Sequence, residues 1–292
     1  NVETARSLVL QAQSSPSQGL WRVIVVEDAD RLGESGANAL LKAIEEPPEH
    51  TVWLLCAPSP EDMIATIRSR CRHLGLRIPT ASAVADLLVR EGVATPDVAL
   101  EAARAAQSHI GLARALARDP QMRERRRAII TAPASVRSVG EAVMAADRLL
   151  ETAKAQADAQ VSERNAREKA ELMRQLGMDE GESATKASRT MIRQLEEDQK
   201  RRSKRALTDA IDRALIDLLA IYRDVLMVQV GGDGELINTD LSDLVHQIAL
   251  DSTPRQTLAR VDHIETARKR LVSNGNPLLV LEDMAISLRP QA

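Results

Sequence analysis

WRVIVVEDADRL, Trp21–Leu32, is the stretch of sequence that decides the fold class. Residues 22–26 predict a buried strand, in which residues 23–26 are all β-branched and apolar, and two acids follow directly. Such a run is typical of a central parallel strand that is covered on both faces. Acids at the carboxyl end of a parallel strand lie where ligands bind in α/β folds. An ordinary polar turn is the alternative interpretation of Glu27 and Asp28.

The residues that follow continue an alternation of strands and helices. In ESGANALLKAIEEPP, residues 34–48, apolar side chains recur at the i, i+3, i+4, i+7 spacing of one helical face, and the two prolines end the helix. TVWLLCA, residues 51–57, predicts a second buried strand. SPEDMIATIRSR, residues 59–70, predicts a helix with Ser59 as its cap, and HLGLRI, residues 73–78, a third short strand. This order is the βαβ rhythm of an open parallel sheet.

Beyond Pro79 the sequence predicts helices and no strand. Short helices are expected over SAVADLLVREG, PDVALEAARAAQ and GLARALARD, with breaks at Gly92 and around Gly111. Two long helices are expected at about 136–176 and 190–230, separated by a polar loop over 177–189. Three more follow in 241–250, 254–273 and 276–288. The fold class is therefore α/β plus all-α.

Composition excludes several classes of protein. The 292 residues carry a net charge of −3, which argues against a surface coated with positive charge for nucleic acid. Aromatic residues make up 1%, so the cores must be built from Leu, Ile, Val, Ala and Met. Two cysteines give neither a disulfide framework nor a complete zinc site, which favours a reducing, cytoplasmic setting. No run approaches 18 apolar residues, so no transmembrane span is predicted.

The segment IATIRSRCRH, residues 64–73, places three arginines at alternate positions around a cysteine. Considered alone, it predicts a solvated basic helix end, which the helix dipole favours. A metal site at Cys71 and His73 is not predicted, because the sequence offers no further ligands nearby. The basic run KRRSKR, residues 200–205, interrupts a long helix and is preceded by the acidic residues EED, 196–198. Opposite charges at helical spacing favour a solvated face over a partner or DNA contact.

Three motifs occur in one order: VVEDADRL, then NALLK with EEPP, then Ser69-Arg70-Cys71. Over residues 22–77 this order resembles the clamp-loader branch of the AAA+ proteins, and within it the delta-prime family of bacterial DNA polymerase III. The resemblance implies a partial AAA+ α/β domain at 1–78, a helical lid at 79–134 and a helical collar for oligomerisation at 135–292. It also implies that the N-terminal part of the AAA+ domain, with the phosphate loop, is missing.

The resemblance assigns roles to individual residues. Arg70 matches the family's arginine finger, which reaches toward ATP on a neighbouring subunit. Glu27 and Asp28 match Walker B in swapped order. Ala57 falls near the sensor threonine, whose hydroxyl it lacks, and Arg114 resembles the lid's sensor arginine.

These assignments imply a subunit without polymerase or ATPase activity of its own. No cofactor or metal is expected on this chain, and ATP-Mg is expected on the neighbour. The implied partners are the gamma/tau and delta subunits, the sliding clamp and primer–template DNA. Two alternatives stay open: a gamma/tau-type ATPase of the same family, and an unrelated helical scaffold.

Overall fold

The computed structural model describes residues 2–14, 19–176 and 186–290. The chain divides into two compact units, Asn1–Arg77 and Ile78–Ala292. The three-part division expected from the sequence, with boundaries at 78/79 and 134/135, stays a prediction.

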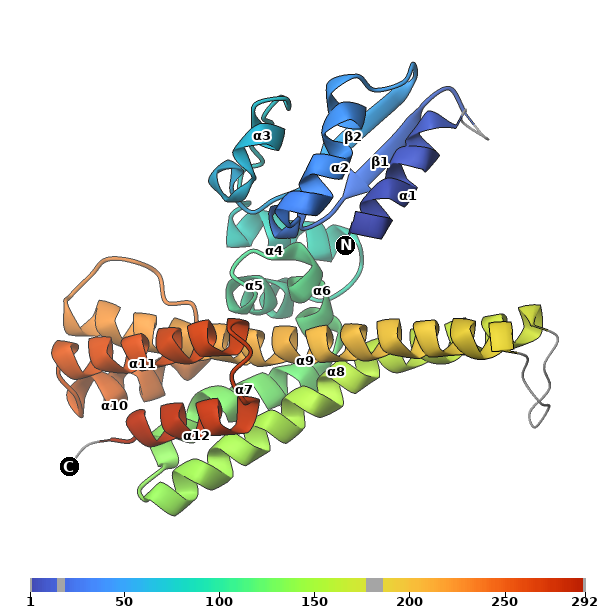
Figure 1. The fold of residues 1–292 in the computed structure, drawn as a ribbon. Helices are drawn as coiled ribbons and strands as arrows, with labels where there is room; N and C mark the ends of the chain where they lie inside the picture. Colours follow the sequence, from blue (N-terminus) through green and yellow to red (C-terminus); the bar gives the residue numbers. More distant parts are fainter. Residues whose placement is uncertain (1, 15–18, 177–185, 291–292) are drawn as a thin grey trace. The chain divides into compact units, whose positions relative to one another are not determined.

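The first unit is a small βαβ arrangement (Figure 1). Strands β1 (Arg22–Val26) and β2 (Thr51–Leu55) are parallel, with Arg22 opposite Thr51 and Val26 opposite Leu55. Helix α2 (Glu34–Glu45) connects them and buries Ala37, Leu40 and Ile44, the face predicted from the spacing. Helix α1 (Val2–Gln13), which the sequence interpretation did not include, packs beside α2.

The prediction that the first strand is covered on both faces is wrong. Ile24 is 8% exposed and points to the helices, whereas Val25 is 53% exposed. Strand β2 alternates in the same way, with Leu54 48% exposed and Leu55 partly buried in the core. Successive side chains of a strand point to opposite faces, so one face of this sheet packs on helices and the other lies bare.

Two further predictions for this unit need correction. Instead of one helix over residues 59–70, a 3-10 turn η2 (Pro60–Asp62) precedes a short helix α3 (Ala65–Arg68). Met63 and Ile64 between them are extended, and both side chains pack on the core that contains Ile67. Residues 73–78 form no strand, because in the described part of the chain β1 and β2 pair only with each other.

The second unit begins with three short helices, as predicted. They are α4 (Ala81–Arg90), α5 (Pro96–Ala105) and α6 (Ile110–Arg118), and they share a core of Ala, Val and Leu. The break at Gly92 is confirmed by its positive φ of 66°. The next break falls at Gln107 and Ser108, which also have positive φ, rather than around Gly111.

Long helices follow. Helix α7 (Pro120–Ser135), which the sequence interpretation missed, leads to α8 (Val139–Gln175) and α9 (Lys186–Gln229). Helix α8 starts at Val139 rather than 136 because Ser138 and Glu141 form a capping box. Of the loop predicted over 177–189, residues 177–185 lie outside the described residues, and 186–189 belong to α9.

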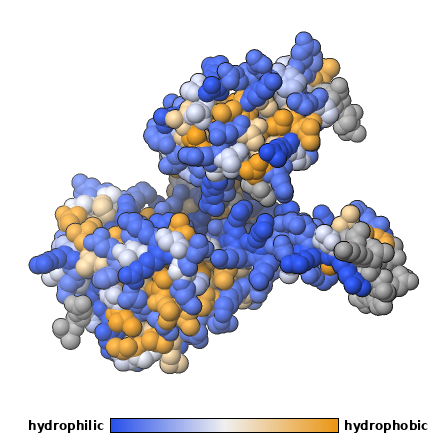
Figure 2. Space-filling model, in the orientation of Figure 1, coloured by the Kyte–Doolittle hydropathy of each residue, from blue (hydrophilic) through white to orange (hydrophobic). Residues whose placement is uncertain are grey.

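Helices α10 (Ser242–Leu250), α11 (Pro254–Val272) and α12 (Pro277–Ser287) complete this unit close to their predicted ranges. Helices α10 and α11 pack on the C-terminal half of α9, and α12 packs on α8 and α11, around a core that includes Leu215, Leu218 and Ile221. The C-terminal part of α8 and the N-terminal part of α9 extend beyond these helices as an antiparallel pair (Figure 1). The surface of this pair is mainly hydrophilic (Figure 2). Among the described residues, no helix is long and apolar enough to cross a membrane.

Candidate functional site

The acids predicted as a swapped Walker B lie in the turn after β1. Glu27 and Asp28 are both exposed, and Asp28 adopts φ 50°, a left-handed conformation that Asp tolerates better than most residues. Its carboxylate lies 3.9 Å from the guanidinium of Arg31. The turn therefore sits at the carboxyl edge of the parallel sheet, as the sequence predicted.

Ala57 belongs to the same edge. The amide of Cys56 donates to the Val26 carbonyl, and the Cys56 carbonyl accepts from the amide of Ala29. These two hydrogen bonds fasten the end of β2 to the acidic turn. Ala57, the next residue, is partly buried. Its side chain is a methyl group, whereas the family that the motifs resemble has a threonine hydroxyl near this position.

The side chains at this edge that could bind a cation are the carboxylates of Glu27 and Asp28, and Ala57 contributes only a methyl group. Within the described ranges, no group of three or more His, Cys, Asp or Glu side chains could hold a metal ion. Mg²⁺ in nucleotide sites takes carboxylates together with substrate phosphates, and a methyl group supplies no ligand for either.

Arg70 is held by three residues at the end of α3. Its Nε donates to Oε2 of Glu45 at 3.0 Å, and its Nη1 donates to the Thr66 carbonyl at 2.9 Å. The Ser69 hydroxyl lies 3.5 Å from the same Nη1. The Arg70 side chain is 35% exposed and the Glu45 side chain 55% exposed. The finger candidate is therefore ordered by contacts yet remains open to an approaching molecule.

The neighbours of Arg70 have different surroundings. Cys71 is partly buried against the core of this unit, and burial raises the pKa of its thiol, which suits a small core side chain better than a nucleophile. Within the described residues, the Arg68 side chain donates one hydrogen bond, to the Pro60 carbonyl at 3.4 Å. Arg72 and His73 are exposed, and neither has a hydrogen bond or ion pair in the part of the chain that is described.

Arg70 and the acidic turn lie at opposite ends of α2. The turn leads into the first residue of α2 through the 3-10 turn η1 (Ala29–Arg31), whereas Arg70 is bound to Glu45, the last residue of that helix. Helix α2, with twelve residues at 1.5 Å each, is ~18 Å long. Arg70 therefore does not point at the acidic edge of its own unit.

Arg114 lies in the second unit, on α6. Its Nε and Nη2 donate to the two oxygens of Glu91, at 2.9 and 2.8 Å. This bidentate pair joins α6 to the end of α4 and gives Arg114 a structural role beside the sensor role that the resemblance implies.

The basic run 200–205 faces residues of its own unit. Arg202 donates to Asn165 and Glu168 across the α8–α9 pair, and the bond to Glu168, together with that from Arg164, lowers the pKa of Glu168. Arg201 lies 3.7 Å from Asp198. Lys204 donates to Asn274. The contacts favour the solvated, intramolecular interpretation of this run.

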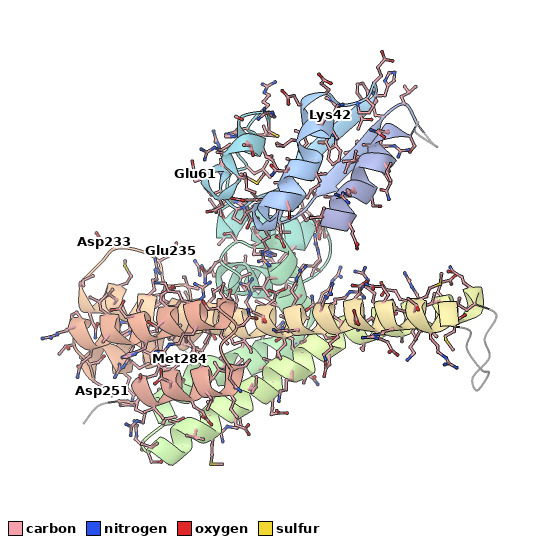
Figure 3. The ribbon with its side chains drawn as sticks, in the orientation of Figure 1. Lys42, Glu61, Asp233, Glu235, Asp251 and Met284 are labelled. Atoms are coloured by element: carbon pink, nitrogen blue, oxygen red, sulfur yellow. The ribbon has the colours of Figure 1, made fainter. Side chains whose placement is uncertain are left out.

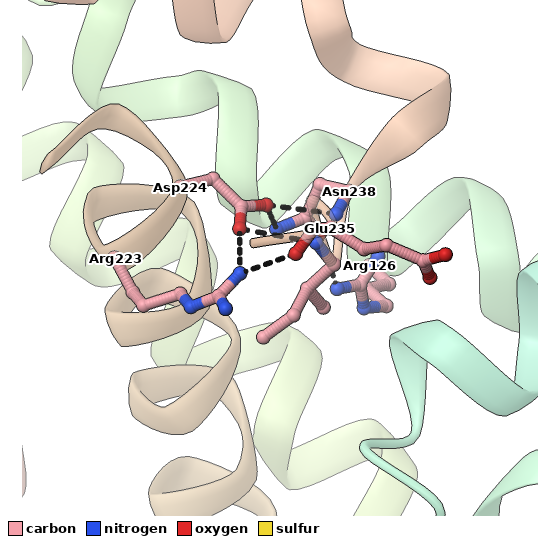
Figure 4. A network of polar contacts seen from close by, with 6 residues as sticks. Arg126, Arg223, Asp224, Glu235 and Asn238 are labelled. Atoms are coloured by element: carbon pink, nitrogen blue, oxygen red, sulfur yellow. Dashed lines mark hydrogen bonds and ion pairs between the residues drawn. The ribbon is translucent and has the colours of Figure 1, made fainter. Parts of the chain in front are cut away.

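The sequence interpretation missed a buried polar network in the second unit (Figure 4). Asp224 is fully buried and accepts hydrogen bonds from Asn238, from the amide of Ile237 and from Arg223. Arg126 donates to Asp217 and to Asn238 in the same region. The polar residues in an apolar run of α9 were the available signal, but their partners lie in other segments.

A pocket of about 200 Å³ opens between α7, α8, α9 and α12, over which Figure 2 shows apolar residues gathered. Its walls are mainly apolar, with Arg125 and Arg148 among the lining residues. None of the residues selected from the sequence lines it, so its shape adds nothing to the candidate site.

Comparison with known proteins identifies the class to which this arrangement is similar. Residues 1–80, which contain β1, α2, β2 and the Ser69-Arg70-Cys71 motif, match the family described as DNA polymerase III, delta subunit. The resemblance to clamp-loader proteins drawn from the motifs is thereby confirmed for this part of the chain.

The particular relatives are subunits of that polymerase. DNA polymerase III subunit delta' of Escherichia coli (strain K12) is 36% identical over 115 residues, which cover 39% of this chain and 34% of that protein. DNA polymerase III subunit gamma/tau of Mycobacterium tuberculosis (strain ATCC 25618 / H37Rv) is 38% identical over 100 residues, 33% of this chain and 17% of that protein. The chain thus matches about a third or less of the length of these relatives.

Among solved structures, the Bacillus subtilis DNA clamp loader delta protein (YqeN) aligns with 98% of this chain and 82% of that chain. The identity is 13% and the TM-score 0.28, a likeness too low to support an argument about fold or function.

Proposed function

We propose that this chain is a subunit of a DNA polymerase III clamp loader that supplies Arg70 in trans to ATP held by a neighbouring motor subunit. It acts in a cytoplasmic hetero-oligomer with gamma/tau and delta subunits, which loads the sliding clamp onto primer–template DNA. The chain itself neither hydrolyses ATP nor polymerises DNA.

The observation that carries the proposal is the setting of Arg70. The guanidinium is ordered by Glu45 and Thr66, is 35% exposed, and lies at the end of α2 away from the acidic turn. A guanidinium placed in this way is suited to a phosphate presented by another molecule, since its planar fork matches phosphate oxygens. The family match over residues 1–80 covers the motif.

The chemistry asked of Arg70 is electrostatic. In phosphoryl transfer, charge spreads over the oxygens of the transferred group, and an arginine finger stabilises that charge. The contribution of such a finger is about 10³–10⁵ in rate in GTPases. Magnesium and nucleotide would be held by the neighbour, so this chain contributes a positioned cation and no proton transfer.

The test is a reconstituted clamp loader that carries Arg70→Ala. We expect intact assembly, with DNA-stimulated ATP hydrolysis and clamp loading reduced by at least about tenfold. Arg72→Ala is the matched control, because Arg72 is an exposed arginine of the same segment. Wild-type rates for Arg70→Ala in an intact complex refute the finger assignment.

A gamma/tau-type ATPase is the second candidate, favoured by the 38% identity to the mycobacterial gamma/tau subunit. It requires that the full-length protein bind ATP. The methyl side chain of Ala57 and the Glu27-Asp28 order argue against it. Equilibrium binding of ATP to the full-length protein separates the two candidates, since only the ATPase should bind nucleotide tightly.

A further inference from the structure

We infer that Glu45 is the positioning residue for Arg70: its carboxylate fixes the Nε side of the guanidinium so that the outer side faces a phosphate. The inference rests on the proposed function, because it assigns a partner to the finger that the proposal identifies. It adds a role for the first acid of the EEPP segment, which no resemblance assigned.

The contacts divide the guanidinium into two sides. Nε is bound to Oε2 of Glu45 at 3.0 Å, and Nη1 to the Thr66 carbonyl at 2.9 Å. For Nη2, no hydrogen bond is found within the residues that the structure describes. The two anchors fix the orientation of the planar group about its long side chain. The two N–H groups of Nη2 thereby remain available for an anion.

Glu45 is attached to a rigid support. It is the last residue of α2, a helix held in the core by Leu40, which is 0% exposed, and by Ile44. Arg70 follows α3, which is held by the buried Ile67. The ion pair therefore links two core-anchored elements that lie 25 residues apart in sequence. Glu46, next to Glu45, is exposed and makes no side-chain bond to Arg70 in the described structure.

A pair of this kind should produce a modest effect. Partly exposed ion pairs are screened by water and salt, and their coupling corresponds to about a two- to fivefold change in an equilibrium. Loss of Glu45 leaves the cation in place but lets the side chain sample other rotamers. We therefore expect a fall in kcat that is far smaller than that caused by removing Arg70 itself.

The experiment compares five variants in the reconstituted clamp loader: Glu45→Ala, Glu45→Gln, the control Glu46→Ala, Arg70→Ala, and the double variant Arg70→Ala with Glu45→Ala. DNA-stimulated ATP hydrolysis is measured over a range of ATP concentrations. Glu45→Ala should lower kcat about two- to fivefold with KM for ATP unchanged. Glu45→Gln keeps an oxygen that accepts from Nε and should recover part of the loss. Glu46→Ala should match wild type.

The double variant separates positioning from a merely structural role. If Glu45 acts through Arg70, Glu45→Ala has no further effect when Arg70 is already alanine. An unchanged or raised kcat for Glu45→Ala overturns the inference, and so does an equal loss on both backgrounds. If Arg70→Ala lowers the rate while Glu45→Ala does not, the proposed function stands and this inference fails. If Arg70→Ala leaves the rate unchanged, both fail.

Discussion

Substitution of Asp224 by alanine should destabilise the helical unit more than almost any other change to a polar residue. The side chain is 0% exposed on α9, and its two oxygens accept four hydrogen bonds. The donors are the backbone amides of Ile237 and Asn238, the side-chain amide of Asn238, and the guanidinium of Arg223 (Figure 4). Asp224 thereby fastens the segment after α9 to the helix.

The expected magnitude follows from the donors that lose their acceptor. A buried donor left without a partner costs about 1–3 kcal/mol, and both backbone amides are affected in Asp224→Ala. The pair with Arg223 adds little, because the Arg223 side chain is 43% exposed and water can solvate it. We expect a total loss of about 3–5 kcal/mol in the free energy of unfolding.

Urea denaturation followed by circular dichroism measures this loss as a shift of the midpoint at constant m value. Thermal unfolding gives a second measure, with about 2–4 °C in Tm for each kcal/mol in a unit of this size. Asp224→Asn keeps one oxygen acceptor and should fall between wild type and Asp224→Ala.

Asp233→Ala is the matched control. Asp233 is an exposed acid of the segment that follows α9 (Figure 3), and its loss should change stability by about 0.5 kcal/mol or less. A loss below about 1 kcal/mol for Asp224→Ala, or an equal loss in the control, would refute the account of Asp224 as the acceptor that holds this segment.

Two further predictions test the sheet and a buried acid. Ile24→Ala should cost about 2–4 kcal/mol and Val25→Ala about 1 kcal/mol or less, because only Ile24 faces the helices; equal losses in chemical denaturation would contradict the assignment of the bare face. Burial raises the pKa of Asp217 above 3.8 despite the ion pair with Arg126. The folded state then retains this proton longer than the unfolded state, so stability falls as pH rises from about 3.8. Asp217→Asn should flatten that fall in unfolding measured across acidic pH, whereas an unchanged slope contradicts the raised pKa.

Local signals in the sequence predicted most helices and both strands. The β-branched run of β1, the apolar spacing of α2 and the proline or threonine starts of the later helices all act within a few residues. Helix α7 was missed because its charged first half carries no apolar stripe. Its arginines find partners far along the chain, such as Arg126 with Asp217 and Arg127 with Asp240. The strand predicted at 73–78 failed for a related reason: a strand needs a neighbouring strand to pair with, and its own residues do not reveal whether one is there.

The candidate site shows the same limit. Composition alone made residues 64–73 a basic helix end, and motif order was needed to select Arg70. No local pattern could pair Arg70 with Glu45, since the contact depends on how α2 and α3 pack. The acidic turn and Ala57, in contrast, follow adjacent parallel strands, so the sequence could place them at one edge.

The geometry gives a physical reason for distinguishing Arg70 from Arg68 and Arg72. Arg68 bonds one carbonyl at 3.4 Å, Arg72 is a solvated charge, and Arg70 alone of the three is held by a carboxylate from another helix. Residues that serve a nucleotide on the same chain belong at the carboxyl edge of the sheet, where Ala57 has no hydroxyl. A residue that serves a neighbour's nucleotide can lie at the other end of α2, a helix ~18 Å long. Under the proposed function, a chain that does not hydrolyse ATP can lose the nucleotide-binding residues at the carboxyl edge while it keeps Arg70.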